Sequence, residues 1–313
     1  MSKALDRANL LAYSAGWSVV RHLPERAAYA LFRTIADYSW WRHGRGVQRL
    51  EANLARAVGP GPVDDAELRA LSRAGMRSYF RYWCDAFRMP DWSHERIVGR
   101  TRVIGEERLH AEMARGRGVV IALPHMANWD HAGGWACLTV SPLATVAERL
   151  KPEELFEKFV AFRESLGMIV LPLTGGGARA TARLAGHLRD GGLVCLPAER
   201  DLSSNGVQVT LFGEATRMPK GSAVLALRTG AALIPAILSY EGTEPNHRLV
   251  IDLRDPIAPP EPGPDQVAQM TQALADEFSR GIAAHPADWH MMQRLFLADL
   301  EPDDPRRAQP ASL

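Results

Sequence analysis

The chain has 313 residues, of which 46% are hydrophobic and 23% charged, as in a globular protein with one large domain or two small ones. Its 37 lysines and arginines are balanced by 36 aspartates and glutamates, so the sequence lacks the positive excess with which proteins bind nucleic acids. The three cysteines, Cys84, Cys137 and Cys195, are far apart, which argues against a disulfide framework or a zinc site and indicates a reducing compartment.

The first 95 residues are predicted to be helical, and the first 42 have the composition of a membrane-facing segment. The sequence predicts two helices with a break near Pro24. In both, basic residues alternate with aromatic and apolar ones. The first 50 residues hold eight basic side chains and three acidic ones. The apolar stretch from Ala8 to Val20 is shorter than the about 20 residues that cross a bilayer as a helix. We expect a helix pair in the membrane interface, a helical cap with a solvated basic face, or both.

Residues 44–95 continue the helical pattern, which a turn interrupts at Gly59-Pro60-Gly61-Pro62. The cluster Tyr79-Phe80-Arg81-Tyr82-Trp83 is interpreted as core or as a wall of an apolar binding site. A nucleic-acid stacking surface is disfavoured, because the chain has no excess of positive charge.

From about residue 100, short apolar strands alternate with helices. This alternation predicts an α/β fold with a mainly parallel central sheet of about seven strands, flanked by helices. Strands are predicted at 118–123, 144–147, 168–172, 193–197, 207–212, 232–239 and 248–253. Helices are predicted near 104–115, 128–139, 152–166, 178–190, 220–229 and 266–284. We expect residues 1–297 to form a single domain, with its α/β core at 100–297, and residues 298–313 to form a flexible tail.

The first candidate for chemistry follows the apolar strand that Gly118 and Pro124 bound. His125 comes directly after this strand, where open α/β sheets bind their ligands, and Asp130 falls at the start of the next helix. The two side chains can converge only if His125 lies in the turn and Asp130 in the first helical turn. A histidine held by a carboxylate can deprotonate a hydroxyl. The alternative is a histidine that caps a helix, with an aspartate favoured by the helix dipole.

Glu199 follows a second apolar strand, at 193–197, within the block Glu199-Arg200-Asp201. In a parallel sheet this position lies on the same edge as His125. We therefore expect Glu199 to approach the imidazole more closely than Asp130 does, with Asp130 serving the geometry of the loop. The alternative is an exposed turn with local ion pairs.

Two regions could bind phosphate. Thr174-Gly175-Gly176-Gly177 precedes a predicted helix, so it can present backbone amides at a helix N-terminus. Arg149 and Arg163 add cations after the strand at 144–147. A flexible turn and a solvated helix face are the alternatives. The sequence contains no G-x-S-x-G and no recognisable cysteine nucleophile, so direct attack by a substrate hydroxyl is favoured over an acyl-enzyme.

Several motifs occur together along the chain: His125-x4-Asp130, Pro197–Asp201, Phe212-Gly213 with Met218–Gly221, Arg228–Ala231 before Pro235, and His285–His290. In order and spacing they resemble the late acyltransferases of lipid A synthesis. Within that superfamily the chain is most similar to the phosphatidylinositol mannoside acyltransferases of actinobacteria. The resemblance covers roughly residues 5–297.

The resemblance implies a peripheral enzyme on anionic lipid at the cytoplasmic face of the plasma membrane, which transfers a palmitoyl-like chain from acyl-CoA to a mannose hydroxyl of the glycolipid. It makes His125 the general base, Glu199 its partner and Asp130 an orienting residue. No metal and no permanently bound cofactor are expected. The residues expected to bind acyl-CoA are Arg149, Arg163, Thr174, Gly175, Gly176, Arg200 and Lys220.

Two alternatives remain open at the level of the sequence. A lysophospholipid or lipid A acyltransferase is one, although lipid A enzymes of this superfamily usually have a longer apolar N-terminal anchor. The other is a catalytically silent lipid-binding protein that uses the same groove.

Overall fold

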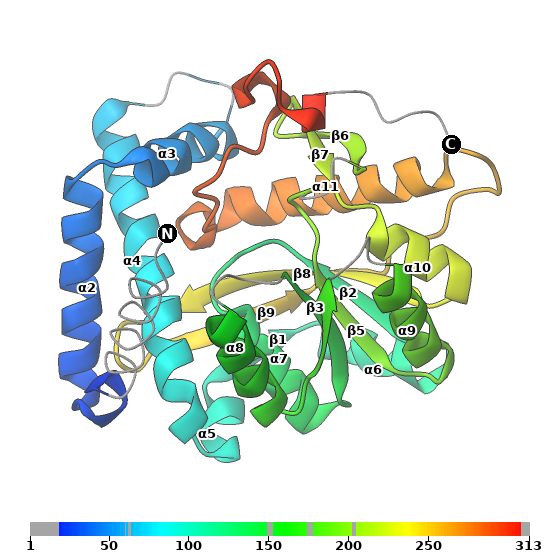
Figure 1. Ribbon diagram of the computed structural model, residues 1–313, viewed down its shortest axis with the longest axis horizontal. Helices are drawn as coiled ribbons and strands as arrows, with labels where there is room; N and C mark the ends of the chain where they lie inside the picture. The colour runs from blue at the N-terminus through cyan, green and yellow to red at the C-terminus, as the bar shows by residue number, and fades with distance from the viewer. Residues whose placement is uncertain are drawn as a thin grey trace.

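A computed structural model describes residues 19–59, 61, 64–148, 153–173, 178–201 and 205–307 (Figure 1). Most of the apolar stretch at 8–20, and residues 308–313, lie outside the described residues. The N-terminal region is helical, as predicted: α2 (Glu25–Trp41), α3 (Arg45–Ala57), α4 (Asp65–Arg88) and α5 (His94–Gly99), with a 3-10 turn at Met89–Asp91. Pro24 immediately precedes α2, where its fixed φ favours a helix start. In Figure 1, α2 and α4 lie side by side.

The α/β core contains a seven-stranded sheet, in the order β1-β9-β8-β2-β5-β3-β4. The predicted α/β fold with a mainly parallel sheet of about seven strands is therefore confirmed. Strands β2, β3, β4, β5 and β8 run parallel, and β9 pairs antiparallel with β8. The strands of this sheet are β1 (Thr101–Ile104), β2 (Val119–Leu123), β3 (Leu143–Glu148), β4 (Ile169–Leu173), β5 (Leu193–Pro197), β8 (Ala232–Glu241) and β9 (Arg248–Leu253).

The membership of the sheet differs from the prediction at one strand. The segment predicted at 207–212 forms β6 (Val207–Leu211), which pairs with β7 (Glu214–Met218) in a separate hairpin beside α11. Its alternating polar and apolar residues suit a hairpin with one buried face, and Phe212 and Gly213 turn with positive φ. The seventh strand is β1, which was not predicted because its four residues form an edge without an apolar run.

Helices cover both faces of the sheet. The crossovers place α7 and α8 on one face of the sheet and α9 and α10 on the other. Helix α11 packs against α10, and α6 packs on β2 and β9. Their bounds lie within about two residues of those predicted. These helices are α6 (Glu106–Ala114), α7 (Trp129–Thr139), α8 (Glu153–Ser165), α9 (Ala178–Arg189), α10 (Gly221–Thr229) and α11 (Gln266–Ala284).

Strand β2 is the buried centre of the sheet, with all five residues buried. Gly118 begins it with φ 73°, and a Cβ at this position would lie 2.5 Å from the backbone oxygen of Leu188. Only glycine therefore fits at the position where the chain enters β2 beside α9. This close approach fixes the start of the strand whose other end carries His125.

Beyond residue 298, the C-terminal segment packs on the N-terminal helical region. Short 3-10 turns form at Leu297–Asp299 and Pro305–Arg307, after one at Pro286–Asp288. Leu300 is buried, and Arg56 of α3 donates hydrogen bonds of 2.8 and 2.9 Å to the carboxylate of Asp299. Within the described residues, the burial of Leu300 and the ion pair of Asp299 with Arg56 hold the start of this segment.

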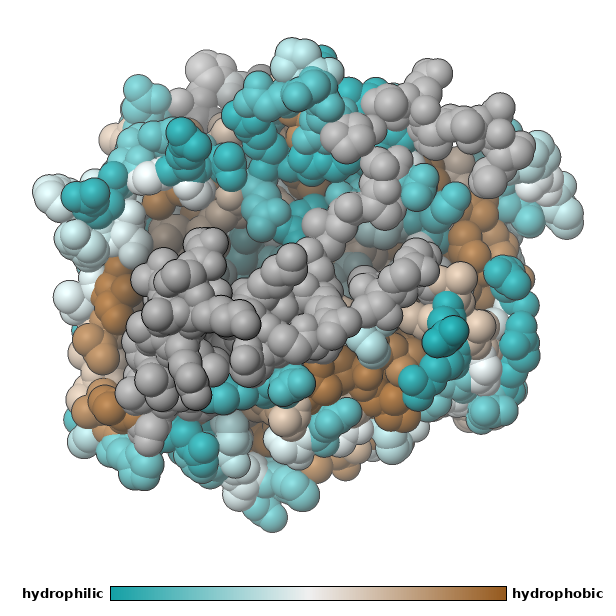
Figure 2. All heavy atoms as spheres, in the orientation of Figure 1, coloured by the Kyte–Doolittle hydropathy of each residue, from teal (hydrophilic) through white to brown (hydrophobic). Residues whose placement is uncertain are grey.

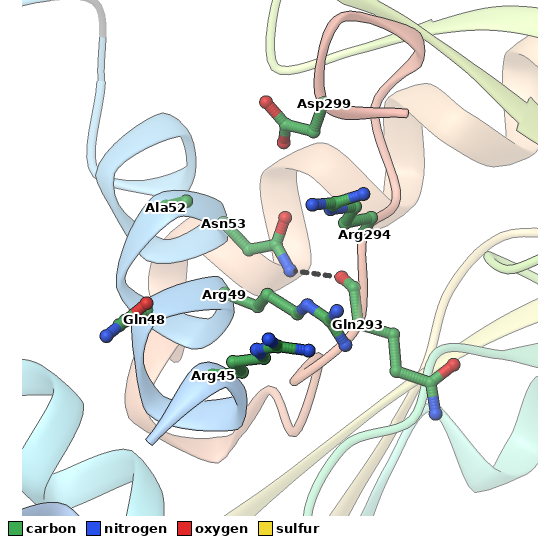
Figure 3. Close-up of a pocket in the computed structure, with 8 residues that line it drawn as sticks. All are labelled: Arg45, Gln48, Arg49, Ala52, Asn53, Gln293, Arg294 and Asp299. Atoms are coloured by element: carbon green, nitrogen blue, oxygen red, sulfur yellow. Dashed lines mark hydrogen bonds between the residues drawn. The ribbon is translucent and has the colours of Figure 1, made fainter. Parts of the chain in front are cut away.

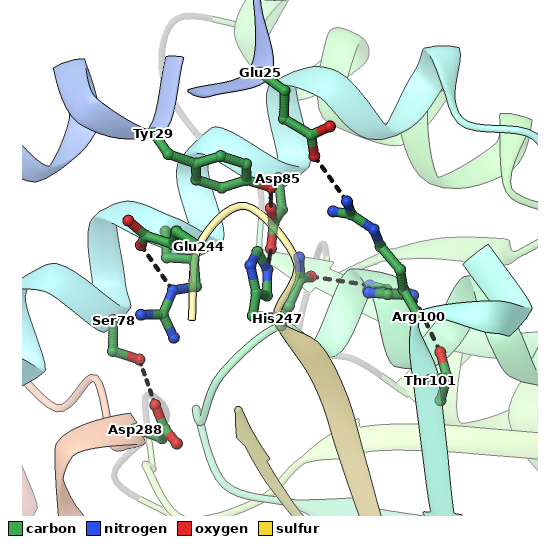
Figure 4. Close-up of polar contacts among 12 residues, drawn as sticks. Glu25, Tyr29, Ser78, Asp85, Arg100, Thr101, Glu244, His247 and Asp288 are labelled. Carbon is green, nitrogen blue, oxygen red and sulfur yellow. Dashed lines mark hydrogen bonds and ion pairs between the residues drawn. The ribbon is translucent and has the colours of Figure 1, made fainter. Parts of the chain in front are cut away.

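A buried polar cluster joins the helical region to the α/β core (Figure 4). The Tyr29 hydroxyl of α2 donates to Asp85 of α4, and the other carboxylate oxygen of Asp85 lies 3.1 Å from Nε2 of His247, between β8 and β9. Burial alone would raise the pKa of Asp85, but the His247 charge and the hydrogen bonds keep that pKa below its ordinary value. One carboxylate thus links three elements.

We predict that Asp85→Ala lowers the free energy of unfolding by about 3 kcal/mol, because it leaves the buried Tyr29 hydroxyl and His247 without their acceptor. The matched control is Asp91→Ala, which removes an exposed ion pair with Arg21 and should cost less than about 1 kcal/mol. Urea unfolding measures both variants. Equal losses would show that the buried cluster does not hold the two parts together.

Candidate active site

His125 lies in the turn that connects β2 to α7. Pro124 ends the strand, Ala127 has φ 43°, and the Asn128 side chain caps α7 by accepting the amide of His131 at 2.9 Å. Asp130 is the second residue of the helix. The two motif residues thus occupy the turn and the first helical turn, as the sequence predicted.

The carboxylate of Glu199 forms a hydrogen bond with the imidazole of His125. Because β5 pairs with β2 in parallel, Leu123 opposite Pro197, the two residues leave the sheet at the same edge. Glu199 Oε1 lies 2.8 Å from His125 Nδ1 and also accepts the His125 backbone N–H at 2.6 Å. With Nδ1 donating to the carboxylate, Nε2 carries the lone pair. Glu199 therefore lies within hydrogen-bond distance of the imidazole, as expected from its position at the end of the neighbouring strand.

The environments of the two side chains differ. Glu199 is fully buried, whereas the His125 side chain is 29% exposed. Burial alone would raise the pKa of Glu199, but the His125 charge and two hydrogen bonds from His125 bring that pKa below its ordinary value. A buried, ionised carboxylate beside Nδ1 stabilises a positively charged imidazole, so His125 is equipped to accept a proton at Nε2.

Asp130 makes different contacts. Its Oδ2 accepts the Tyr82 hydroxyl at 2.8 Å, and its Oδ1 accepts Arg163 Nε at 2.7 Å. Tyr82 also stacks on Trp129, with ring centroids 4.3 Å apart. Burial would lower the pKa of Arg163, but the Asp130 charge raises it above its ordinary value. Asp130 therefore fastens the start of α7 to α4 and α8.

A segment near the C-terminus supports the His125 turn from the other side. His290 N donates to the His125 carbonyl at 2.9 Å, and Ala127 N donates to the Asp288 carbonyl at 2.9 Å. Ser78 Oγ of α4 donates to Asp288 Oδ1 at 2.6 Å (Figure 4). The same oxygen lies 2.9 Å from His290 Nε2. These contacts hold the loop backbone and thereby the position of the imidazole.

Sequence reasoning missed Ser78, Asp288 and His290 as parts of the site. The available signals were the spacing of Ser78 and Tyr82, four residues apart on one face of α4, and the acidic and imidazole groups of the 285–290 motif. Burial raises the pKa of Asp288, and burial lowers the pKa of His290 to about 3. His290 is thus neutral at pH 7, which leaves His125 as the more exposed base of the pair.

The residues expected to bind the donor have different positions. Arg149, Thr174, Gly175 and Gly176 lie outside the described residues. Arg163 is engaged with Asp130, and Arg200 donates from its guanidinium to the Gln293 side chain. Lys220 is the residue before α10, at the same sheet edge as His125 because α10 runs back along β2 and β8.

An apolar cavity of about 40 Å³ lies beside the ion pair of Asp130 and Arg163, between α7 and the sheet. Burial raises the pKa of the Cys195 thiol on its wall to about 12, and burial also raises the pKa of Cys84 and of Cys137. These thiols stay protonated at pH 7 and are poor nucleophiles. The cavity is lined by Leu123, Trp129, Asp130, Gly133, Leu143, Thr145, Val146, Arg163, Met168, Cys195 and Pro197.

The described part of the chain contains neither a metal-ligand cluster nor a helix able to cross a membrane. No three histidine, cysteine, aspartate or glutamate side chains there come close enough together to hold a metal ion. Among the helices of those residues, none combines the length and the apolar character that crossing a bilayer requires.

A histidine backed by a buried carboxylate at the carboxyl edge of an α/β sheet is the equipment for activating a hydroxyl. The chain belongs to the bacterial lipid A biosynthesis acyltransferase family, whose model matches residues 2–298, and it is therefore an acyltransferase. It is 48% identical over 299 residues to the phosphatidylinositol mannoside acyltransferase of Mycolicibacterium smegmatis, covering 96% of this chain and 94% of that protein. The protein of the same description from Mycobacterium tuberculosis (strain CDC 1551 / Oshkosh) is 48% identical over 304 residues, 95% of this chain and 91% of its own. The family resemblance inferred from the motifs is confirmed.

We predict that Asp130→Asn lowers the free energy of unfolding by about 3 kcal/mol and lowers activity, because the mostly buried Arg163 guanidinium loses its counter-charge. Adding Arg163→Met should recover part of the stability, since the uncompensated charge is then absent. Asp190→Asn, at an exposed carboxylate, is the control. Urea unfolding curves decide, and a loss no larger than that of the control would contradict this role for Asp130.

Proposed function

We propose that the protein transfers a long acyl chain, palmitoyl-like in length, from acyl-CoA to a mannose hydroxyl of a phosphatidylinositol mannoside. The names of its relatives support the acceptor, and their identity extends over nearly the whole chain. The observation that supports the chemistry best is the contact of Glu199 with His125 Nδ1, which leaves Nε2 as the base of a partly exposed imidazole.

In this mechanism His125 Nε2 accepts the proton of the acceptor hydroxyl as its oxygen attacks the thioester carbonyl carbon. The tetrahedral intermediate then expels the coenzyme A thiolate, which takes the proton from the imidazolium. One C–O bond forms and one C–S bond breaks, so His125 returns to its neutral state. Glu199 stabilises the imidazolium between the two steps.

The donor site is proposed at the same sheet edge. Arg200 and Lys220 supply cations there, and Arg149 with the loop residues Thr174, Gly175 and Gly176 would complete the phosphate contacts. Arg163 would act through Asp130. The apolar cavity beside that ion pair offers a starting point for the acyl chain. Acyl-CoA is a substrate in this proposal, and no permanently bound cofactor takes part.

The outer face of α2 is proposed to lie on an anionic membrane at the cytoplasmic side. Leu31, Ile35, Tyr38 and Trp41 are exposed along it, and Trp41 is 67% exposed. Figure 2 shows apolar side chains along this edge of the molecule. The arginines of the same helix region, Arg26, Arg33 and Arg42, are exposed as well. Aromatic and basic residues together are typical of the lipid headgroup region.

We predict that His125→Ala lowers turnover about 10²-fold or more, with little change in donor binding, because a general base contributes about 10²–10⁴-fold. Glu199→Gln should lower turnover in a still-folded protein, since an amide does not stabilise the imidazolium. The control is His110→Ala, at an exposed histidine of α6.

The assay measures transfer from radiolabelled palmitoyl-CoA to phosphatidylinositol mannosides, lysophospholipids and a lipid A precursor. Preference for one of the other two acceptors would support the alternative acyltransferases. Lipid binding without transfer to any acceptor would support a catalytically silent protein, and full activity of His125→Ala would exclude the mechanism.

The membrane proposal predicts that Arg26→Gln/Arg33→Gln weakens binding to phosphatidylglycerol vesicles by about 2 kcal/mol, and that salt weakens the wild type in the same direction. Trp41→Ala should weaken binding by removing apolar contact, whereas Ile104→Ala, at an exposed site on β1, should not. Vesicle co-sedimentation measures all four proteins. Equal binding to phosphatidylcholine vesicles, or binding indifferent to salt, would rule out electrostatic attachment through α2.

A further inference from the structure

A cavity of about 380 Å³ lies between α3 and the C-terminal segment, at the residues that follow His290. Figure 3 shows the side chains of Arg45 and Arg49 reaching from α3 toward Gln293, with Arg294 beside Asn53. The cavity is lined by Arg45, Gln48, Arg49, Ala52, Asn53, Gln293, Arg294 and Asp299.

The positive charge of this cavity is not compensated by the residues that the structure describes. Arg45 and Arg49 form no hydrogen bond and no ion pair with any of those residues, although Arg49 is half-buried. Arg294 pairs with Glu301. Among the described residues that line the cavity, Asp299 has the only carboxylate, and it accepts two hydrogen bonds from Arg56 at 2.8 and 2.9 Å. Two arginines therefore face the cavity without a counter-charge in the described part of the chain.

The stability of α3 does not account for this arrangement. Arg45 and Arg49 are four residues apart on one face, so their charges repel each other. Arg45 is also the first residue of the helix, where the dipole disfavours a cation, and the first turn contains no acidic residue. An anion held between the two guanidinium groups would remove both penalties, since arginine forms paired hydrogen bonds to phosphate or carboxylate.

The cavity is connected to the catalytic histidine through short contacts. Asn53 Nδ2 donates to the backbone oxygens of Met291 and Gln293 at 2.7 and 2.9 Å, which fixes the segment on α3. The Gln293 side chain accepts from Arg200, the residue after Glu199. A ligand in the cavity is thus one side chain away from the Glu199 block.

We infer that this cavity binds a phosphate group of a substrate whose reacting group lies at His125. This inference rests on the proposed function, in which both substrates contain phosphate. The phosphodiester of the glycolipid head group and the phosphates of coenzyme A share the chemistry that two arginines recognise. Nothing in the motif-based donor site includes Arg45, Arg49 or Arg294, so the cavity adds a second phosphate contact outside that site.

The test is equilibrium binding of two soluble probes, glycerophosphoinositol and coenzyme A, with free inositol as the uncharged control. The proteins are the wild type, Arg45→Gln/Arg49→Gln, and Arg189→Gln/Arg228→Gln. The last pair removes the same charge from exposed sites at the ends of α9 and α10, at the opposite edge of the sheet. We expect the cavity variant to bind one probe about 10²-fold more weakly, about tenfold for each arginine, with inositol unaffected.

A loss limited to glycerophosphoinositol assigns the cavity to the acceptor, and a loss limited to coenzyme A assigns it to the donor. The same substrate should show a raised KM with little change in kcat, which a structural defect would not produce. If the glutamine variant fails to fold, Arg45→Lys/Arg49→Lys keeps the charge and should show a smaller loss of the same kind. Binding of both probes equal to that of the control variant overturns the inference. Probe binding by a wild type that transfers no acyl group would instead refute the proposed function alone.

Discussion

The site depends on one carboxylate oxygen that accepts two N–H groups from the same residue. Glu199 Oε1 binds both the backbone amide and Nδ1 of His125, so it fixes the loop and the ring together. Two N–H donors from one residue leave the imidazole little freedom to rotate away, and they define which nitrogen carries the proton. Burial of Glu199 is unfavourable for an ionised group, and the adjacent His125 offsets that cost.

This contact requires β2 and β5 to be neighbours, and it requires the turn after β2 to hold its shape. The parallel register meets the first requirement. The second is met from three directions: Tyr82 on α4 and Arg163 on α8 hold Asp130, and the 288–290 segment hydrogen-bonds the loop backbone. The two residues of the H-x4-D motif therefore differ in physical role. His125 has a side chain that is 29% exposed, and Asp130 anchors the helix that follows the turn.

The sequence predicted the strand-end positions of His125 and Glu199 because each follows a short apolar run, and because parallel strands bring their carboxyl ends to one edge. It could not predict the support from Ser78 and Asp288, which are 210 residues apart and meet only through the packing of α4. Local pattern also misassigned β6, since alternation describes a hairpin and a sheet strand equally well, and it overlooked β1, a short edge strand that β9 completes. Tertiary pairing decides such segments, and a single sequence does not contain it directly.

The arginines of the helical region differ in whether they pair with a carboxylate. Most of them pair with carboxylates: Arg73 and Arg77 share Asp37, and Arg96 and Arg100 share Glu25. Among the described residues of α2 to α5, Arg88 donates to the backbone oxygens of Val20 and Leu23, and the other arginines without a carboxylate partner fall into two groups. Arg26, Arg33 and Arg42 lie along a helix with exposed aromatic residues, which suits a broad anionic surface. Arg45 and Arg49 converge on a cavity, which suits a single compact anion. Because α3 starts four residues after α2 ends, the cavity adjoins the helix whose outer face is proposed to contact the membrane.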